Sequence, residues 1–595
     1  MTTYSAPLRD MRFVLHELLE VGELATLRGY EEATPDLIDA VLEEGAKLAE
    51  NVLFPLNRSG DEEGCTFENG VVRTPRGFKE AYDQFAEAGW VGLAADPAFG
   101  GQGLPAVVKV AFDEMICSAN LSFGTYPGLS GGAYKAIEHH ADDGLKALYL
   151  PKLVAGRWSG TMCLTEPQCG TDLGLIRTRA EPNGDGSYSI TGTKIFISAG
   201  EHDLTENIVH LVLARLPDAP AGIKGISLFL VPKFLPRDGA PGPRNGVRCG
   251  GLEHKMGIKA SATCVMNFDG ATGWLVGEPH RGMRAMFTMM NEARLEVGIQ
   301  GLGIAETAYQ SAVAYARERL QGRALSGSKA PDQPADPILV HPDVRRMLLT
   351  MRAFTEGGRA LACWVGQSID RARRHPEPEA RRSADDFVAL MTPIVKAYFT
   401  DQGSACANLG VQVMGGHGYI REWGMEQLVR DARITQLYEG ANGIQALDLV
   451  GRKLPAHFGR YLRTFFHPVM AFIEQHQMNA ALADFVLPLA KAFARLQQVT
   501  LHVAQQGMKD PDEAGAASCD YLRLFALVAM AYLWARMAEI AQARLAAGVD
   551  DPAFYQAKLA TARFFMAKIL PESGALFAQI MAGSAPVMQF EDAAF

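Results

Sequence analysis

The hydrophobic pattern of this chain changes near Gly160 and changes back near Gly282, and this change most constrains the fold. Between these points, several short segments are rich in β-branched and aromatic residues and are bounded by Gly, Pro and Asp, which is typical of strands. They are Ser187–Ser198, Asn207–Leu216, Gly225–Phe234 and Thr263–Phe268. Several such segments in succession predict a small β-barrel or sandwich. Pro236, Pro241 and Pro243 predict a loop between the last two strands.

Apolar residues recur at helical spacing on both sides of this β region. The expected helices are Met11–Leu24, Leu37–Leu53, Met283–Leu320, Asp343–His375, Arg382–Met414, Asn442–Leu454 and Tyr521–Leu545. The segment Ala324–Pro337 is rich in Ser, Pro, Gly and Asp and is expected to be a loop. We therefore predict a mainly α protein with a central β domain. The predicted division is an N-terminal helical domain (1–157), a β domain (158–278), a helical bundle (279–454) and a C-terminal helical extension (455–595).

The bulk composition limits the class of protein. The chain has 595 residues, 48% of them hydrophobic, and a formal net charge of −10, which disfavours a nucleic-acid-binding protein. Its nine cysteines include no CxxC pair and no zinc spacing, so no metal site is expected. The N-terminus lacks the apolar run of a secretion signal. The uncharged stretch near the C-terminus, Leu524 to Ala535, is too short to cross a bilayer, which needs about 20 residues. We expect a cytoplasmic protein with no membrane span.

A glutamate in a glycine-flanked turn is the strongest candidate for chemistry. Glu439 lies in the sequence Leu437-Tyr438-Glu439-Gly440-Ala441-Asn442-Gly443, among small residues. A carboxylate on such a turn can reach a bound ligand, and desolvation there makes it a stronger base. Taken alone, a glutamate near a turn is more often a solvated surface charge.

Three further motifs occur in an order that resembles the acyl-CoA dehydrogenase family. Residues 162–172, MCLTEPQCGTD, resemble the family's flavin-binding loop, and Lys194–Ser198, KIFIS, resemble the strand behind the flavin ring. Residues 412–419, QVMGGHGY, resemble the glycine-rich turn that meets a neighbouring subunit's FAD. The resemblance covers residues 30 to 452. The joint match is specific, although each motif alone is weak.

The resemblance implies FAD as the cofactor. The chemistry suits these residue types, because a flavin needs backbone N–H groups, hydroxyls and small residues at its polar edge. The residues implied as cofactor-binding are Met162, Cys163, Leu164, Thr165, Gly170, Thr171, Phe196, Ile197, Ser198, Arg319, Gln412, Gly415, Gly416, Ala441 and Gly443. Two departures from the family occur. Leu320-Gln321 follows Arg319, where the family usually has a Phe-Gly pair. Ala441 occupies a position where the family usually has a threonine.

The resemblance also assigns the substrate site. Glu439 is implied to be the base that removes the α-proton of an acyl-CoA thioester, while the β-hydride moves to flavin N5. Ala293 occupies the position of the base in other branches and cannot serve. The residues implied to contact the substrate are Thr171, Asn291, Arg294 and Gly440. Asn291 and Arg294 lie three apart, on one face of a helix. The product is a trans-2-enoyl-CoA, and the implied electron acceptor is an electron-transfer flavoprotein.

The C-terminal extension and the opening residues 4–13 resemble an extended bacterial branch of this family. That branch includes 3-methylmercaptopropionyl-CoA dehydrogenases and long fatty acyl-CoA dehydrogenases, so either acyl group is open as the substrate. The extension is implied to cover a surface that shorter members use for tetramer packing, which predicts a homodimer.

Three other functions compete with this interpretation. An acyl-CoA oxidase would pass electrons to O₂ and is not separated by sequence. An enzyme like nitroalkane oxidase would carry Asp at the base position. A non-catalytic, DNA-binding flavoprotein of the alkylation-response type would have a basic C-terminal domain, whereas residues 455–595 hold 11 Lys/Arg and 12 Asp/Glu.

Overall fold

The computed structural model describes residues 2–595, which form two compact units. Of the described residues, unit 1 comprises 2–46, 105–118 and 297–595, and unit 2 comprises 47–104 and 119–296. The long helices α5 (Ala106–His140) and α7 (Gly282–Glu318) each begin in one unit and end in the other. In α5 the division falls beside Asn120, whose φ of −160° and ψ of 91° interrupt the helix.

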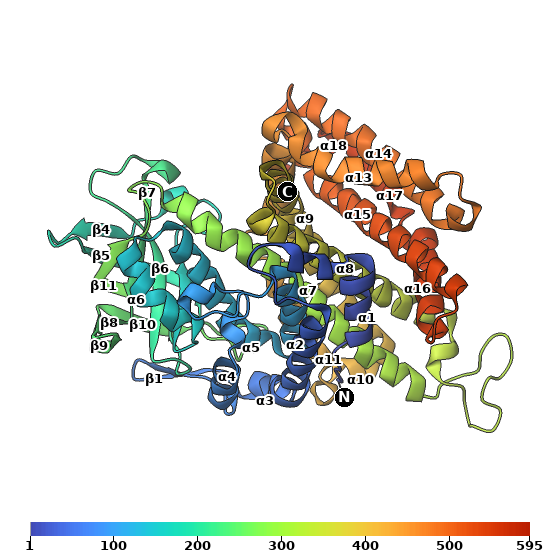
Figure 1. Ribbon diagram of the computed structural model, residues 1–595, viewed down its shortest axis with the longest axis horizontal. Coiled ribbons are helices and arrows are strands. Elements are labelled where there is room, and N and C mark those ends of the chain that lie inside the picture. The colour runs from blue at the N-terminus through green and yellow to red at the C-terminus, as the bar shows by residue number, and fades with distance from the viewer. Residues whose placement is uncertain (1) are drawn as a thin grey trace. The chain divides into compact units, whose positions relative to one another are not determined.

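Unit 2 contains all the strands of the described chain, and most of them belong to one sheet (Figure 1). The strands are β1 (Thr66–Glu68), β2 (Val71–Arg73), β3 (Trp158–Cys163), β4 (Arg179–Pro182), β5 (Tyr188–Ser198), β6 (Asn207–Arg215), β7 (Ile226–Pro232), β8 (Phe234–Arg237), β9 (Ala240–Arg244), β10 (Val247–Leu252) and β11 (Thr263–Leu275). The helices that belong wholly to unit 2 are α3 (Phe54–Glu63), α4 (Phe78–Glu87) and α6 (Asp143–Val154).

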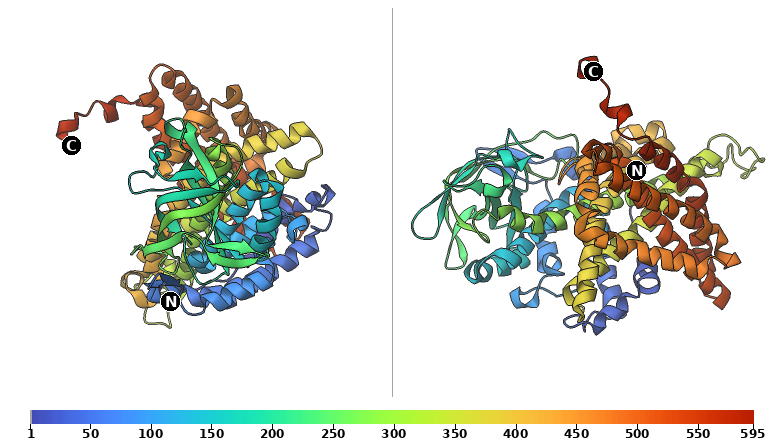
Figure 2. Two further views of the ribbon diagram at one scale, coloured as in Figure 1. Left: turned by 90° about the vertical axis from the view of Figure 1, so that its left-hand side faces the viewer. Right: turned by 90° about the horizontal axis from the view of Figure 1, so that it is seen from above.

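The main sheet closes on itself. The strands run in the order β10-β11-β5-β4-β6-β3, and β7 pairs with both β11 and β6, which joins β11, β5, β4, β6 and β7 in a ring. The sequence pattern left a small barrel and a sandwich open, and the closed ring is a barrel. Its interior is filled by alternate side chains of these strands, including Ile190, Val212, Phe229 and Met266. The left view of Figure 2 looks onto these strands.

The proline-rich segment is a correction to the sequence prediction. Instead of a loop, β8 and β9 form an antiparallel hairpin in which Pro236 faces Pro241. Proline lacks an N–H but is tolerated in a two-stranded ribbon, because both strands are edges and not every residue must donate. The strands β3, β4 and β10 were also not predicted. β3 is buried at every position, so it shows no alternation between apolar and polar residues.

Unit 1 is helical. Its helices are α1 (Leu8–Arg12), α2 (Pro35–Leu48), α8 (Pro342–Arg374), α9 (Pro378–Met414), α10 (Gly416–Tyr419), α11 (Met425–Thr435), α12 (Asn442–Asp448), α13 (Arg460–His476), α14 (Ala483–Gly507), α15 (Pro511–Ala547), α16 (Pro552–Phe564), α17 (Glu572–Met581) and α18 (Ala585–Met588). Three long predicted helices match α7, α8 and α9 closely, whereas the predicted Tyr521–Leu545 begins ten residues after the start of α15. The predicted loop Ala324–Pro337 contains no helix or strand.

Helix α15 is the centre of the C-terminal block, which is orange to red in Figure 1. It packs against α8 and α9, where Trp534 Nε1 donates to Ala353 O at 3.2 Å. This helix is long and apolar enough by composition to cross a membrane, yet 83% of its most apolar window is buried within the protein.

A buried cluster of charges joins the C-terminal block to the start of the chain. Arg359, in α8, is 1% exposed and forms ion pairs with Glu114, Glu306 and Asp10. Lys558, in α16, is fully buried and forms ion pairs with Asp10 and with Glu356, the latter at 2.7 Å. Buried charges must be paired in this way, because an isolated one costs several kcal/mol.

Candidate functional site

The predicted site residues fall into two groups, one in each unit. In unit 2, strand β3 ends at Cys163 and continues directly into the loop, and the 162–172 segment contains six of them. Glu166 and Cys169 exchange backbone hydrogen bonds of 2.9 and 3.0 Å and close a tight turn. Thr165 is half-buried, whereas Gly170 and Thr171 are exposed. The loop therefore exposes Gly170 and the Thr171 hydroxyl, and partly exposes Thr165.

A buried ion pair holds this loop from behind. The Lys194 ammonium is fully buried and donates to Glu166 Oε1 at 2.8 Å and to Leu164 O at 3.0 Å. The Glu166 carboxylate also accepts hydrogen bonds from Thr178 and from the backbone N–H of Arg177. Burial raises the pKa of Glu166, but Lys194 and these hydrogen bonds outweigh it and lower its pKa to about 2. The pair ties the loop to β5 through Leu164 O and to the following segment through the backbone N–H groups of Arg177 and Thr178.

Phe196 lies on β5 in an unusual conformation. Its φ is 58° and its side chain is 60% exposed, whereas the next residue, Ile197, points into the barrel and is 2% exposed. The pairing of β5 with β11 shifts here, because Ile197 faces Cys264 and Lys194 faces Met266. Two residues of β5 thus oppose one of β11, which is a β-bulge that redirects a side chain. The bulge leaves an aromatic ring open on the outside of the barrel.

The substrate candidates of unit 2 differ in exposure. On α7, Asn291 is exposed, whereas Arg294 is only 7% exposed and its guanidinium lies 5.8 Å from the Phe287 ring centroid. Positions three apart on a helix differ by about 60° around its axis, so one can face solvent while the other faces the interior. No other part of the chain crowds Gly170, because an added Cβ would contact only Thr165 Cγ2, at 3.8 Å.

In unit 1, the turn after α9 carries a second group of candidates. Gly415 has a φ of 59°, and an added Cβ on either Gly415 or Gly416 would meet nothing within 4 Å. The neighbouring His417 stacks on Trp423 with centroids 4.4 Å apart and accepts or donates a 3.0 Å hydrogen bond with Tyr315. Gln412 is also exposed on this turn.

Arg319 directly follows the end of α7. It lies one helical turn after Tyr315, whose hydroxyl contacts His417 of this turn. Its N–H donates to Tyr315 O at 2.9 Å and its carbonyl accepts from Ile338 N at 2.8 Å. The side chain is exposed. The structure thus brings an exposed guanidinium and an open glycine pair to one end of α7 and α9, which is an arrangement suited to an anionic ligand.

Glu439 lies in a left-handed turn between α11 and α12. Its φ is 57° and that of Gly440 is 84°, and Glu439 is half-buried. Beside it, Tyr438 is anchored by a short hydrogen bond from its hydroxyl to Gln300 Oε1. Such φ values are unfavourable for residues with a Cβ, so the surrounding structure must hold Glu439 in place.

Two amide side chains hold the turn, the buried Gln445 and the half-buried Asn442, and the sequence patterns had indicated neither. Gln445 Nε2 donates to Glu439 O at 3.2 Å and to Gly440 O at 3.1 Å. Asn442 accepts from Lys396 Nζ at 2.9 Å and donates to Asp401 Oδ1 at 2.7 Å. The sequence offered one signal, a helix predicted from Asn442 onward, but neither side chain could be assigned a partner without coordinates.

Ala441 and Gly443 complete this group. Ala441 is the N-cap residue of α12 and has no side chain that could accept a hydrogen bond from the first turn. Gly443 is exposed, and an added Cβ there would meet nothing within 4 Å. The start of α12 therefore has an open surface.

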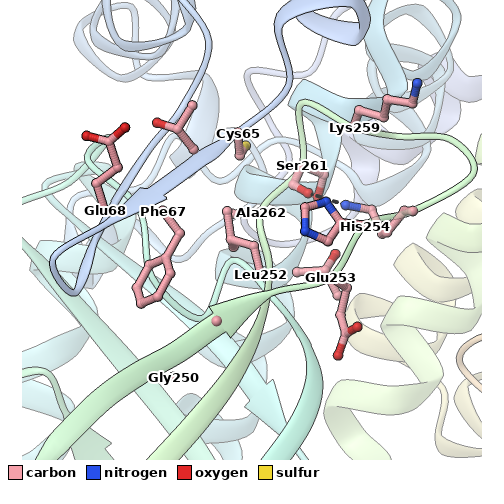
Figure 3. A pocket seen from close by; sticks show the side chains of 14 residues that line it. Cys65, Phe67, Glu68, Gly250, Leu252, Glu253, His254, Lys259, Ser261 and Ala262 are labelled. Atoms are coloured by element: carbon pink, nitrogen blue, oxygen red, sulfur yellow. Dashed lines mark hydrogen bonds between the residues drawn. The ribbon is translucent and has the colours of Figure 1, made fainter.

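A cavity of about 480 Å³ lies elsewhere in unit 2 (Figure 3). It is lined by residues of β1, the end of β10 and the loop that follows, including Phe67, Leu252, His254 and Ser261. None of the predicted site residues lines it. Among residues 2–595, no group of three or more His, Cys, Asp and Glu side chains is placed to hold a metal ion.

The chain matches known protein families and relatives over nearly its whole length. Residues 39–157, 161–271 and 280–454 match the N-terminal, middle and C-terminal domains of acyl-CoA dehydrogenase, and residues 465–591 match "Acetyl-CoA dehydrogenase C-terminal like". The chain is 47% identical over 580 residues to 3-methylmercaptopropionyl-CoA dehydrogenase of Ruegeria pomeroyi, covering 97% of this chain and 98% of the relative.

Two further proteins are similar over nearly their full length. The broad-specificity linear acyl-CoA dehydrogenase FadE5 of Mycobacterium tuberculosis is 35% identical over 617 residues, with both chains fully covered. The crystal structure of an acyl-CoA dehydrogenase complexed with FAD from Bacillus anthracis shares the fold, with a TM-score of 0.75 and 20% identity, covering 94% of this chain and 90% of that one. Since the matching domains succeed one another in this order over almost all residues, the chain belongs to the acyl-CoA dehydrogenase family, as an oxidoreductase with an additional C-terminal domain.

Proposed function

We propose that this protein oxidises an acyl-CoA thioester to the trans-2-enoyl-CoA, with FAD as its cofactor and Glu439 as the base. The observation that carries the proposal is the turn at Glu439. Glu439 is half-buried, its backbone is left-handed, and the buried Gln445 amide donates to its carbonyl. Retained backbone strain of this kind is characteristic of functional sites.

Each unit, taken by itself, carries residues that suit part of a flavin nucleotide. The exposed Phe196 ring provides a flat apolar face. Thr165 in the 162–172 loop and Ser198 in β5 each carry a hydroxyl that can form a hydrogen bond with the flavin. Gly415 and Gly416 leave room for a close approach of backbone to ligand, and Arg319 suits a pyrophosphate. When bound, FAD supplies the acceptor for the hydride that leaves the β-carbon.

The chain's own contribution is the removal of a proton and the stabilisation of charge. The Glu439 carboxylate takes the proton from the carbon next to the thioester carbonyl. As negative charge develops on the thioester oxygen, a fixed backbone N–H donor such as that of Glu439 stabilises it. Arg294 and Asn291 serve the coenzyme A portion, with the buried guanidinium of Arg294 held against Phe287.

For the acyl group, we propose 3-methylmercaptopropionyl-CoA as the first substrate to test and linear fatty acyl-CoA as the second. The relative with the first of these names is 47% identical over nearly the whole of both chains, and the broad-specificity linear enzyme is 35% identical. Anaerobic bleaching of the flavin by a panel of acyl-CoA thioesters will rank them. Bleaching by longer linear thioesters alone would overturn the first choice.

We propose a cytoplasmic homodimer that passes its electrons to an electron-transfer flavoprotein. The C-terminal block covers α8 and α9 within unit 1, which supports a smaller assembly than the tetramer of the shorter family members. Sedimentation at equilibrium should give a dimer mass, and a tetramer mass would refute this. Rapid consumption of oxygen with substrate would favour an oxidase instead.

The decisive test is Glu439→Gln, with Glu292→Gln as the matched control. Glu292 is another half-buried glutamate and lies beside Ala293, the base position in other branches. We expect Glu439→Gln to retain FAD and bind acyl-CoA but to lose turnover by about 10²–10⁴-fold, because an amide cannot take the proton. Glu292→Gln should bleach at the wild-type rate. Normal bleaching in Glu439→Gln would overturn the assignment.

A further inference from the structure

The Glu439 turn has an unusual backbone conformation that the end of α11 alone does not hold. Two consecutive residues, Glu439 and Gly440, have left-handed φ values of 57° and 84°. Leu437 and Tyr438 both donate to Ile434 O, so the end of α11 holds the chain only as far as Tyr438. The peptide carbonyls of Glu439 and Gly440 point instead toward α12.

Gln445, one turn into α12, meets both of these carbonyls. Its side chain is fully buried, and the two hydrogen bonds from Nε2 are 3.2 and 3.1 Å long. The approach is close, because an added Cβ on Gly440 would lie 2.6 Å from Nε2. Glycine at 440 therefore leaves the space through which the amide reaches the turn.

The other half of the same amide has no partner. Gln445 Oε1 is buried and accepts no hydrogen bond from residues 2–595. Burying an acceptor without a partner is costly, because the group gives up its hydrogen bonds to water. Rotating the amide would not relieve the cost, because it would place Oε1 against the two carbonyl oxygens. A glutamine kept at this cost is kept for its two donors, and both donate to the turn that carries the base.

Asn442 acts on a different part of the turn. Its side chain bonds to Lys396, Thr400 and Asp401, and its backbone N–H donates to Gln436 O at 3.1 Å. These contacts fix the two ends of the loop 436–442 to each other and to α9. They do not involve the Glu439 or Gly440 carbonyls, so the orientation of the central peptides depends separately on Gln445.

We propose that Gln445 is a positioning residue for the catalytic base: by clamping the Glu439 and Gly440 carbonyls, its amide sets the direction in which the Glu439 carboxylate points. This inference rests on the proposed function of Glu439. The clamp is neutral, so it orients the base without placing a charge beside it.

The first test is Gln445→Met, which keeps the volume and removes both donors. Gln367→Met is the matched control, because Gln367 is also a buried glutamine of unit 1 whose Nε2 donates to a backbone carbonyl, that of Leu19, at 2.6 Å. We expect Gln445→Met to keep wild-type FAD content and acyl-CoA affinity, to bleach at least 10-fold more slowly and to show a larger isotope effect with α-deuterated substrate. Amide hydrogen exchange at residues 439–441 should accelerate. Gln367→Met should change none of these.

The second test is Gln445→Glu, which is nearly isosteric and reports through pH. The protonated carboxyl can still donate one hydrogen bond to the turn, whereas the ionised form repels both carbonyls. We expect bleaching to slow as pH rises through a range where the wild-type rate does not change. A Gln445→Glu profile that superimposes on wild type, or a wild-type isotope effect and exchange rate in Gln445→Met, would overturn the positioning role. Failure of the wild-type protein itself to bleach with any acyl-CoA would instead sink the proposed function.

Discussion

The 162–172 loop with its strand and the Glu439 turn solve the same local problem by different chemistry. Each displays a non-glycine residue with a φ near 58°, Phe196 in one case and Glu439 in the other. Behind the loop stands a fully buried ion pair, Lys194–Glu166, whereas the carbonyls of the turn are held by the neutral amide of Gln445.

The difference follows from what each region displays. The loop and strand present an aromatic ring and hydroxyls, so a strong charged pair behind them disturbs no titrating group on the surface. The turn presents a carboxylate whose proton affinity matters, and a charge on its own clamp would shift that affinity. The comparison teaches that rigidity can be supplied by charge where the displayed groups are neutral, and is better supplied by dipoles beside a base.

Breaking the charged clamp should give the largest effect on stability. Lys194→Met leaves the Glu166 carboxylate buried without its cation, which costs about 3–5 kcal/mol. Chemical denaturation should show this loss, and the purified variant should retain far less flavin. The double variant Lys194→Met with Glu166→Gln should recover much of the stability, because no unpaired charge remains. A single variant as stable as wild type would show that the pair is not needed to hold the loop.

Acid should sharpen the comparison with a smaller effect. The pKa of Glu166 is lowered from about 4.5 to about 2 in the folded protein, so folding favours its charged form. Its contribution is therefore present above about pH 4.5 and is lost as pH falls toward 2. The unfolding free energy of Glu166→Gln should fall less steeply than that of wild type across this window. Parallel curves for the two proteins would contradict the charged clamp.

The smallest effect is expected at the helix that follows the turn. Ala441 is the N-cap of α12 without a capping side chain, whereas in the 162–172 loop Asp172 accepts from Gly174 N at 2.9 Å. Ala441→Thr should add about 0.5–1 kcal/mol to the unfolding free energy, because its hydroxyl can accept from the first turn of the helix. Thermal unfolding of the protein should detect it, with Ala441→Val as the control of similar shape. Equal stability of the two variants would argue against capping.

Much of the fold could be predicted from sequence because it depends on local periodicity. The predicted helix Met283–Leu320 corresponds to α7, Gly282–Glu318, and four predicted strands correspond to β5, β6, β7 and β11. The hairpin at Pro236 and Pro241 could not be predicted, because prolines usually end strands and the pairing depends on neither residue having to donate. The division into two discontinuous units also escaped prediction, since it depends on contacts between distant segments.

The motifs of the candidate site were recognisable, but their supports were not. Lys194 was part of a quoted motif, yet its contact with Glu166, 28 residues away, requires knowing that β5 passes behind the loop. Gln445 lies within the predicted helix Asn442–Leu454, where its sequence context does not distinguish it from an ordinary helical residue. A single sequence shows which side chains chemistry would use, whereas the residues that hold them are defined by three-dimensional proximity.

The buried pairing of Lys558 with Asp10 has a consequence for biosynthesis. Asp10 emerges from the ribosome at the very beginning, but one of its two cationic partners is made more than 500 residues later. Until then Asp10 has only Arg359 of these two cations, so the buried cluster stays incomplete and sealing it from water is less favourable. Assembly of the helical unit is thus a late event in translation, and shortened chains that end before α16 should be captured in a loosened, protease-sensitive form.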